Sequence, residues 1–392
     1  MKKSLSLLLI FAMLFVFCAC GKKDEPEKNQ SIEVFVPEKK TVIMVAPKDE
    51  YPEEYLAAHE LADAYPDKVI VCEYLDSRII TAGSTDLVVL SGEYAADETV
   101  GAILYARATP FTSDASRKAK SINPNIVTAA IEPEANIDTV ATVCDFVISV
   151  DWERYAKDVV KTATDMGAKN FLFLTNDRHL QNSSYVNLKE FITDNCEKNR
   201  KTMKFTFRTM LDPFYNNMDA VKKDCENQID ELLNGNFIDK DTVLFSTDST
   251  VQSTLASVAK DKGMYYLCPE FPTAYEGVSQ KYNVSYPESV TDLKEFTSSV
   301  KKFIPDVADH FAVYNFPLAT VMMKASLYTI FDLLNKEVKS ENVIDRLDIR
   351  LNDTADFKEF KVRKYVGVSN TLKVYAPGFI TYEKVKEVKE KK

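Results

Sequence analysis

Glycine is scarce in this chain of 392 residues, which has 10 where an average protein of this length has about 27. No GxGxxG or GxxxxGK[ST] spacing occurs, so a glycine-rich loop that cradles phosphate groups is not expected. The chain has 3 histidines, which form no HExxH or other metal-ligand spacing, and it has no GxSxG nucleophile motif. The sequence therefore predicts no cofactor, no bound metal and no enzyme of these types.

Paired cysteines are also lacking. Beyond residue 20 the cysteines are odd in number and no two form a CxxC pair: they are Cys72, Cys144, Cys196, Cys225 and Cys268. A disulfide framework is therefore not indicated. Cys72 and Cys144 adjoin apolar runs, and we expect them to be small core residues.

A basic surface is excluded by the charge, because the formal net charge is −10. Nucleic-acid binding needs a basic face, so no nucleic-acid partner is expected. An apolar content of 45% with 28% charged residues is typical of a soluble globular protein. The length exceeds that of one ordinary hydrophobic core, which predicts two lobes.

The first 20 residues have the pattern of an export signal. Lys2 and Lys3 give a positive start, and residues 5–17 form an apolar run too short to span a bilayer. The segment Phe17-Cys18-Ala19-Cys20 resembles the lipobox of bacterial lipoproteins, in which the last cysteine is lipidated. We expect a lipid anchor on Cys20 at the extracytoplasmic face of the cell membrane. A plain secretory signal and a membrane anchor remain alternatives.

Downstream of the signal, residues 21–40 are charged and are expected to be a flexible tether. Apolar strands then alternate with amphipathic helices. The pattern predicts strands at 41–46, 68–74, 101–105, 125–131, 145–150, 170–174, 204–209, 242–245 and 264–267. It predicts helices at 53–64, 153–167, 185–200, 218–233, 250–262 and 316–335. Residues 86–95 are ambiguous, since Val88-Val89-Leu90 favours a strand but the neighbouring spacing favours a helix. The tail, 347–392, is interpreted as strands with a charged terminus.

Two successive β-α series predict an α/β fold with two Rossmann-like lobes and parallel sheets. The N-terminal lobe is expected at 41–150 with about 312–340. The C-terminal lobe is expected at 151–311 with part of 341–392.

Two segments, 146–168 and 244–263, resemble the strand, Asp and helix units of type I periplasmic-binding proteins. From about Thr41 to Lys336 the chain is also similar to a bacterial lipoprotein family, domain of unknown function 3798. The segments that carry this similarity are 107–110, 116–118, 131–133, 178–179, 211–213, 245–252, 268–269 and 314–317. The family pattern places a helix on 86–95. Asp248 stands where the family usually has Asn, and a Trp usual near Asn315 is missing.

Ligands of open α/β sheets bind beyond the carboxyl ends of the strands, where helix N-termini offer unsatisfied N–H groups. The candidate ligand-binding residues at such positions are Arg107, Glu132, Asp151, Trp152, Arg178, His179, Asp248, Glu270, Tyr314 and Asn315.

Each main candidate also has an ordinary structural interpretation. Asp151 and Asp248 each precede a helix and are suited to cap it. Trp152 is suited either to stack on a ring or to be buried between helices. Arg107 is suited either to hold a carboxylate or phosphate or to form a surface salt bridge. Arg178 and His179 also suit a solvated loop.

These patterns favour a solute-binding lipoprotein that captures a small polar ligand between two lobes for an ABC importer and its permease. One alternative is a ligand-sensing co-receptor for a membrane signalling protein. Another is a cleft enzyme such as a glycosidase, in which Glu132, Asp151 and Asp248 would supply the carboxylates.

Overall fold

The computed structural model describes residues 32–48, 51–75, 80–81, 84–134, 136–199, 203–268, 275–285, 293–314, 318–354, 361–375 and 378–382. The chain divides into two compact units, Met1–Glu33 and Val34–Lys392, and all the helices and strands below belong to the second. The predicted signal, Cys20, Glu270 and Asn315 lie outside the described residues.

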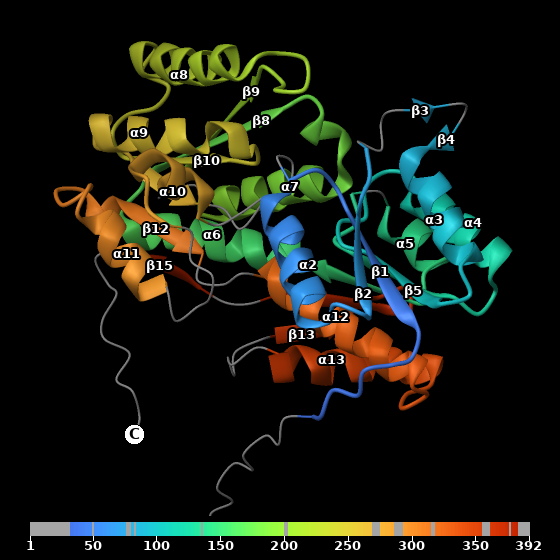
Figure 1. Cartoon of the computed structure of the whole chain (residues 1–392). Coiled ribbons are helices and arrows are strands. Elements are labelled where there is room, and N and C mark those ends of the chain that lie inside the picture. The colour runs from blue at the N-terminus through green and yellow to red at the C-terminus, as the bar shows by residue number, and fades with distance from the viewer. Residues whose placement is uncertain are drawn as a thin grey trace, which may run out of the picture. The chain divides into compact units, whose positions relative to one another are not determined.

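A seven-stranded sheet combines strands from residues 40–150 with two strands from residues 361–375 (Figure 1). Its strands, in spatial order, are β13 (Lys361–Lys364), β14 (Thr371–Tyr375), β7 (Phe146–Val150), β6 (Val127–Ile131), β5 (Val100–Tyr105), β1 (Lys40–Val45) and β2 (Val69–Glu73). All neighbours are parallel except β13 and β14. The interior strands β5 and β7 are buried along their whole length, as continuous apolar runs require.

A six-stranded sheet follows. Its order is β15 (Phe379–Thr381), β12 (Phe311–Tyr314), β11 (Tyr265–Cys268), β10 (Thr242–Ser246), β8 (Asn170–Asn176) and β9 (Lys204–Met210). Only the β12–β15 pair is antiparallel. A short hairpin joins β3 (Ile80–Thr81) to β4 (Ser84–Thr85).

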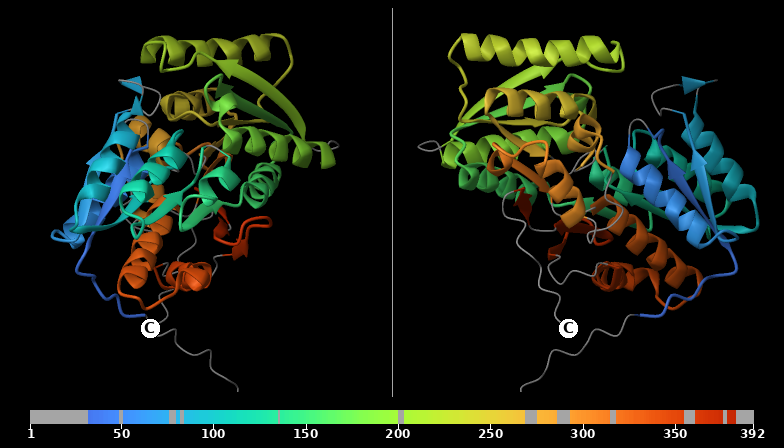
Figure 2. Two further views of the ribbon diagram at one scale, coloured as in Figure 1. Left: turned by 90° about the vertical axis from the view of Figure 1, so that its right-hand side faces the viewer. Right: turned by 60° about the vertical axis from the view of Figure 1, so that its left-hand side comes forward.

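Helices cover both faces of each sheet (Figure 2). On the seven-stranded sheet, one set of helices is α2 (Pro52–Ala64), α12 (Leu318–Leu334) and α13 (Val343–Thr354), in which α12 packs against both of the others. The other set is α3 (Asp86–Ala96), α4 (Thr112–Ile122) and α5 (Ile137–Ala141), in which α4 packs against both of the others. On the six-stranded sheet, α6 (Trp152–Met166) packs with α7 (Ser183–Lys198), and α9 (Gln252–Lys262) packs with α8 (Met218–Asn234) and α10 (Glu276–Tyr282). The remaining elements are α11 (Leu293–Lys301) and the 3-10 turns η1 (His179–Gln181), η2 (Ser249–Val251), η3 (Ala308–His310) and η4 (Ser340–Asn342).

The sequence of α6 explains both of its ends. Asp151 caps the first turn by accepting a hydrogen bond from the Arg154 N–H, and Gly167 ends the helix at a φ of +106°. Such a backbone conformation suits glycine because it has no Cβ. The buried stripe between these ends includes Val159 and Val160, and each apolar side chain of this size contributes about 1.5–3 kcal/mol by leaving water.

The predicted α/β class with two parallel-stranded sheets is confirmed, with one antiparallel pair in each large sheet. Residues 86–95 are helical in α3, as the family pattern indicated. The buried residues of α3 include Gly92, where an added Cβ would lie 3.1 Å from Lys118 Cε on α4. Glycine therefore allows these two helices to approach closely.

The strand prediction for the start of the tail is wrong, because 347–354 belong to helix α13. Its buried apolar residues Val343, Leu347 and Leu351 recur at every fourth position, which places them on one helical face against α12. The later tail does form β13, β14 and β15.

Strand membership shows where the chain passes between the two large sheets. It leaves the seven-stranded sheet after β7, returns after β12 through α12 and α13, and crosses again after β14 to add β15. The predicted lobe boundaries stay a prediction. The tether prediction ended at residue 40, and near that end the Phe35 carbonyl accepts a hydrogen bond from Asn335 Nδ2 at 2.6 Å.

Candidate functional site

The predicted site residues follow the carboxyl ends of strands in both large sheets. In the seven-stranded sheet, Arg107 follows β5, Glu132 follows β6, and Asp151 and Trp152 follow β7. In the six-stranded sheet, Arg178 and His179 follow β8, Asp248 follows β10, and Tyr314 is the last residue of β12. These are the edges where open α/β sheets present loops and helix N-termini to ligands.

Arg107 is buried, with only 1% of its surface exposed. Its Nη1 lies 3.6 Å from Glu54 Oε1, and its Nε lies 3.5 Å from Glu134 Oε1. The guanidinium carbon also lies 4.9 Å from the centre of the Tyr51 ring, a cation–π distance. The alternative of a surface salt bridge is therefore wrong, because these pairings lie in the interior.

Glu132 is a buried acceptor whose backbone adopts a φ of +44°, which is uncommon for a residue with a side chain. Its Oε2 accepts hydrogen bonds from the Val150 N–H at 2.6 Å and from Ser149 Oγ at 3.0 Å. Its Oε1 accepts hydrogen bonds from Trp152 Nε1 at 2.7 Å and from Ser184 Oγ at 3.2 Å. Four donors thus satisfy this carboxylate and hold its position.

The first turn of α7 contacts the loop that follows β6. Ser184 Oγ lies 3.1 Å from the Pro133 carbonyl, which shares the single hydroxyl hydrogen with Glu132 Oε1, and Ser183 Oγ donates to the Glu134 carbonyl at 3.3 Å. Since α7 follows β8 of the six-stranded sheet and the loop follows β6 of the seven-stranded sheet, these bonds join the carboxyl edges of the two sheets.

Asp151 and Trp152 both have structural roles here. Asp151 caps α6 and pairs with Arg363 Nη2 at 2.6 Å. Trp152, the only tryptophan of the chain, is 4% exposed and packs edge-on against Tyr155, with 5.5 Å between ring centres. Tyr314 is fully buried and packs against the same Tyr155 at 5.5 Å.

Arg178, His179 and Asp248 form the part of the site that belongs to the six-stranded sheet. Arg178 Nε lies 3.4 Å from Asp212 Oδ1 in the loop after β9. His179 Nδ1 shares a hydrogen bond of 2.9 Å with Thr247 Oγ1, and its ring centre lies 4.5 Å from that of Tyr185.

Asp248 caps η2 by accepting from the Thr250 N–H at 2.9 Å, and it also accepts from Asn176 Nδ2 at 2.6 Å. It is therefore buried and hydrogen-bonded, and capping is its evident structural role.

Burial shifts the pKa values of the acidic groups around Arg107. It raises the pKa of Glu54 from 4.5 to about 7; Arg107 opposes this shift, while Glu132 and Glu134 add to it. Burial and the neighbouring Glu54 raise the pKa of Glu53 to about 8, although hydrogen bonds from Thr320 oppose the shift. Burial also raises the pKa of the Tyr51 hydroxyl well above its usual value, and Glu134 adds to that shift.

The structure thus joins Glu132 to Trp152 by a hydrogen bond, and both Arg107 and Glu132 interact electrostatically with Glu54. Tyr185 lies close enough to Arg107 and Arg178 to interact electrostatically with both. Asp151 instead forms an ion pair with Arg363 on β13.

Sequence reasoning missed several residues that lie in this cluster: Tyr51, Glu54, Glu134, Ser184 and Tyr185. Tyr51 and Glu54 could have been identified from the sequence, because they follow β1 at the same sheet edge as Arg107.

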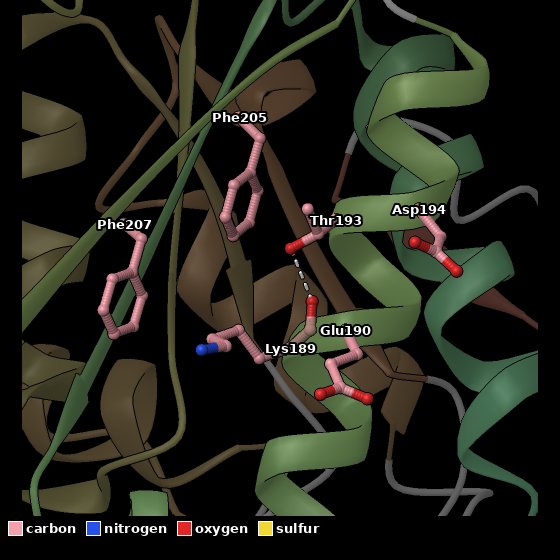
Figure 3. A pocket seen from close by; sticks show the side chains of 6 residues that line it. All are labelled: Lys189, Glu190, Thr193, Asp194, Phe205 and Phe207. Carbon is pink, nitrogen blue, oxygen red and sulfur yellow. Dashed lines mark hydrogen bonds between the residues drawn. The ribbon is translucent and has the colours of Figure 1, made fainter.

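A separate surface hollow of about 430 Å³ lies between α7 and β9 (Figure 3). It is lined by Lys189, Glu190, Thr193, Asp194, Phe205 and Phe207. Lys189 Nζ lies 4.7 Å from the centre of the Phe207 ring. Phe205 and Phe207 lie in the first half of the edge strand β9, so this hollow lies away from the carboxyl ends of the strands.

Within the described ranges, no group of three or more His, Cys, Asp or Glu side chains is arranged to hold a metal ion. Among the helices that the structure describes, none has the length and apolar character needed to cross a membrane.

A family model with the description "Protein of unknown function (DUF3798)" matches residues 40–310. No curated protein is similar enough in sequence to count as a match.

Two solved structures show the same fold. One is described as a transcriptional regulator from Clostridium difficile 630; it has 16% identity and a TM-score of 0.67, and the match covers 88% of this chain and 99% of that one. The other is an ABC transporter solute-binding protein from Clostridium phytofermentas with bound L-rhamnose; it has 12% identity and a TM-score of 0.54, and the match covers 88% and 97% of the two chains. The expected fold, like that of type I periplasmic-binding proteins, is confirmed.

Proposed function

Because this chain belongs to the DUF3798 family, whose description assigns no activity, we propose a function from the geometry: the protein is a solute-binding protein that captures a small polar molecule where the carboxyl edges of its two sheets meet. The single observation that carries this proposal is the buried cluster around Arg107. It combines charged and aromatic side chains from loops of the seven-stranded sheet with Tyr185 and Ser184 from α7.

The chemistry of this cluster suits binding. A guanidinium, carboxylates and phenol groups are excluded from water at the strand ends, so polar contacts with a solute are stronger there than at the surface. In this proposal the two sheets are the cores of two lobes that close around the solute, and the bonds from Ser183 and Ser184 join the carboxyl edges of these sheets.

In this proposal the protein acts outside the cytoplasmic membrane, held by a lipid on Cys20, and delivers its solute to the permease of an ABC importer. The solute-binding protein from Clostridium phytofermentas has the same fold, and the lipobox-like segment places Cys20 at the end of an export signal. In this proposal the cluster holds the solute and releases it unchanged.

The test is a thermal-shift screen of the purified chain against sugars, nucleosides, amino acids and vitamins, together with mass spectrometry of small molecules that co-purify with it. Saturable stabilisation by one class, lost in Arg107→Ala, is the expected result. No stabilisation by any class and no co-purified molecule would count against the proposal. Arg117→Ala is the matched control, because Arg117 is an exposed arginine of α4 paired with Asp114.

A further inference from the structure

The charges around Arg107 do not balance. Glu54, Glu132 and Glu134 all lie close enough to interact electrostatically in this cluster, and Arg107 is the cation that contacts two of them. The two contacts are long, at 3.6 Å to Glu54 and 3.5 Å to Glu134. Glu132 also interacts electrostatically with Lys373 on β14, so Arg107 is left facing two buried carboxylates, Glu54 and Glu134.

Two of the three carboxylates have nearby donors. Glu132 accepts four hydrogen bonds, as described above, and Glu134 Oε1 accepts a short hydrogen bond from the Tyr51 hydroxyl. These bonds disperse the negative charge over neighbouring groups.

Glu54 differs from them. Glu54 is only 2% exposed, yet the Oε2 atom of its carboxylate accepts no hydrogen bond from any of the residues that the structure describes. The other oxygen of the same carboxylate is the one that faces Arg107, so the group lies at the centre of the cluster. A buried carboxylate oxygen without a donor is costly, and such an atom marks a place where a partner belongs.

The electrostatics point to the sign of that partner. Burial is the largest influence on Glu54 and raises its pKa, and Glu132 and Glu134 raise it further. Arg107 and the backbone N–H of Glu54 itself oppose the shift without restoring the ordinary value. An anionic group placed here would add to the repulsion, whereas a cationic group would offset it.

We infer that the solute presents a protonated nitrogen, an ammonium or amidinium group, to the unpartnered oxygen of Glu54. The inference rests on the proposed function, since it assumes that the solute enters this cluster. Tyr185 lies close enough to Glu54 and Glu134 to interact electrostatically with both, and aromatic faces attract cations. A neutral polyol would donate the missing hydrogen bond to Glu54 Oε2 but would leave the surplus negative charge of the carboxylates unbalanced.

The experiment compares cationic probes with neutral probes of similar shape, using the purified full-length chain. The pairs are D-glucosamine with D-glucose, and putrescine with 1,4-butanediol, measured by thermal shift and calorimetry. Mass spectrometry of co-purified molecules runs in parallel. The expected result is tighter binding of at least one cationic member than of its neutral counterpart, or a co-purified solute that carries a basic nitrogen.

Glu54→Gln is expected to weaken binding of the cationic probe about 10- to 100-fold, the effect of losing a hydrogen bond to a charged group. Glu53→Gln is the matched control: Glu53 is an adjacent buried carboxylate on the same helix, but it accepts from Thr320 instead of facing Arg107. The Glu53→Gln variant should bind the cationic probe with an affinity within a few-fold of that of the wild type. Comparing the two probes on the wild-type chain keeps the test independent of whether either variant folds.

Binding of the neutral member as tightly as the cationic one, or a co-purified solute without basic nitrogen, would overturn this inference and leave the proposed function standing. Wild-type affinity of Glu54→Gln for the cationic probe would also overturn it. No binding of any probe and no co-purified solute would count against both.

Discussion

Ser184 donates a hydrogen bond from Oγ to Glu132 Oε1 at 3.2 Å, and this bond joins helix α7 to the loop after β6. The same hydroxyl lies 3.1 Å from the Pro133 carbonyl. A small side chain at a helix start thus links groups at the edges of two different sheets.

Replacing Ser184 with alanine is expected to lower the free energy of unfolding by about 1–3 kcal/mol, because Glu132 is a buried charged acceptor that loses one donor. Urea unfolding followed by the fluorescence of Trp152 measures the change, since Trp152 donates to the same carboxylate. Ser257→Ala on α9 is the control, because the hydrogen bond of its hydroxyl goes to Asp261 on the same helix at 3.4 Å and not to a different sheet. Equal losses in the two variants would contradict the role assigned to Ser184.

Stability is expected to fall as pH rises from about 5 to 8. The pKa of Glu53 is raised from 4.5 to about 8, and that of Glu54 from 4.5 to about 7. At pH values between 4.5 and these raised pKa values, the folded chain therefore holds protons that the unfolded chain has released. Raising the pH therefore favours the unfolded chain.

Glu53→Gln should flatten this pH profile, because Glu53 contributes a slope of at most about 1.4 kcal/mol per pH unit. Urea unfolding at several pH values measures it, and Glu60→Gln, an exposed glutamate of the same helix, is the control. Parallel profiles for wild type and Glu53→Gln would show that Glu53 does not titrate in this range.

The buried cysteines are expected to resist alkylation in the folded protein. Burial raises the pKa of both Cys144 and Cys196 to about 12, so the reactive thiolate is scarce at pH 8, and both side chains are shielded from solvent. Mass spectrometry after iodoacetamide treatment should find these two unmodified in buffer and modified in urea. Rapid modification in buffer would show that the surrounding core opens readily.

A fatty acid is expected on Cys20. Metabolic labelling with an alkyne fatty acid should mark the wild-type chain and Cys18→Ser, but not Cys20→Ser. The neighbouring cysteine is the control because it lies in the same segment. A label that persists in Cys20→Ser would refute the proposed anchor.

The elements that could be predicted from the sequence are those with a strong local signal. Strands β1 and β5 are continuous apolar runs, and α6 has both an Asp cap and a terminal Gly. Helix α3 was ambiguous because Val88-Val89-Leu90, a continuous run of apolar residues, favours a strand locally. What makes it a helix is its packing on α4, which includes Gly92, and this contact is not visible locally.

The same limit applies to the site. The rule that ligands bind at strand ends identified Arg107 and Glu132, which the structure places in one buried cluster. It did not identify Glu54, because acidic residues in the first turn of a helix are ordinary partners of the helix dipole. Ser184 also escaped notice, since Asn182 and the serines after it have the pattern of a helix start.

The route of the chain also has a consequence for synthesis. Strands β13 and β14, which complete one edge of the seven-stranded sheet, are made after β12 of the other sheet, and β15 is made last of all the described strands. Neither sheet is complete until these later strands have been made, so a chain truncated before residue 361 would leave β7 and β12 as open edges. Such unfinished edges invite pairing with other chains, which makes strands β13, β14 and β15 a safeguard against aggregation.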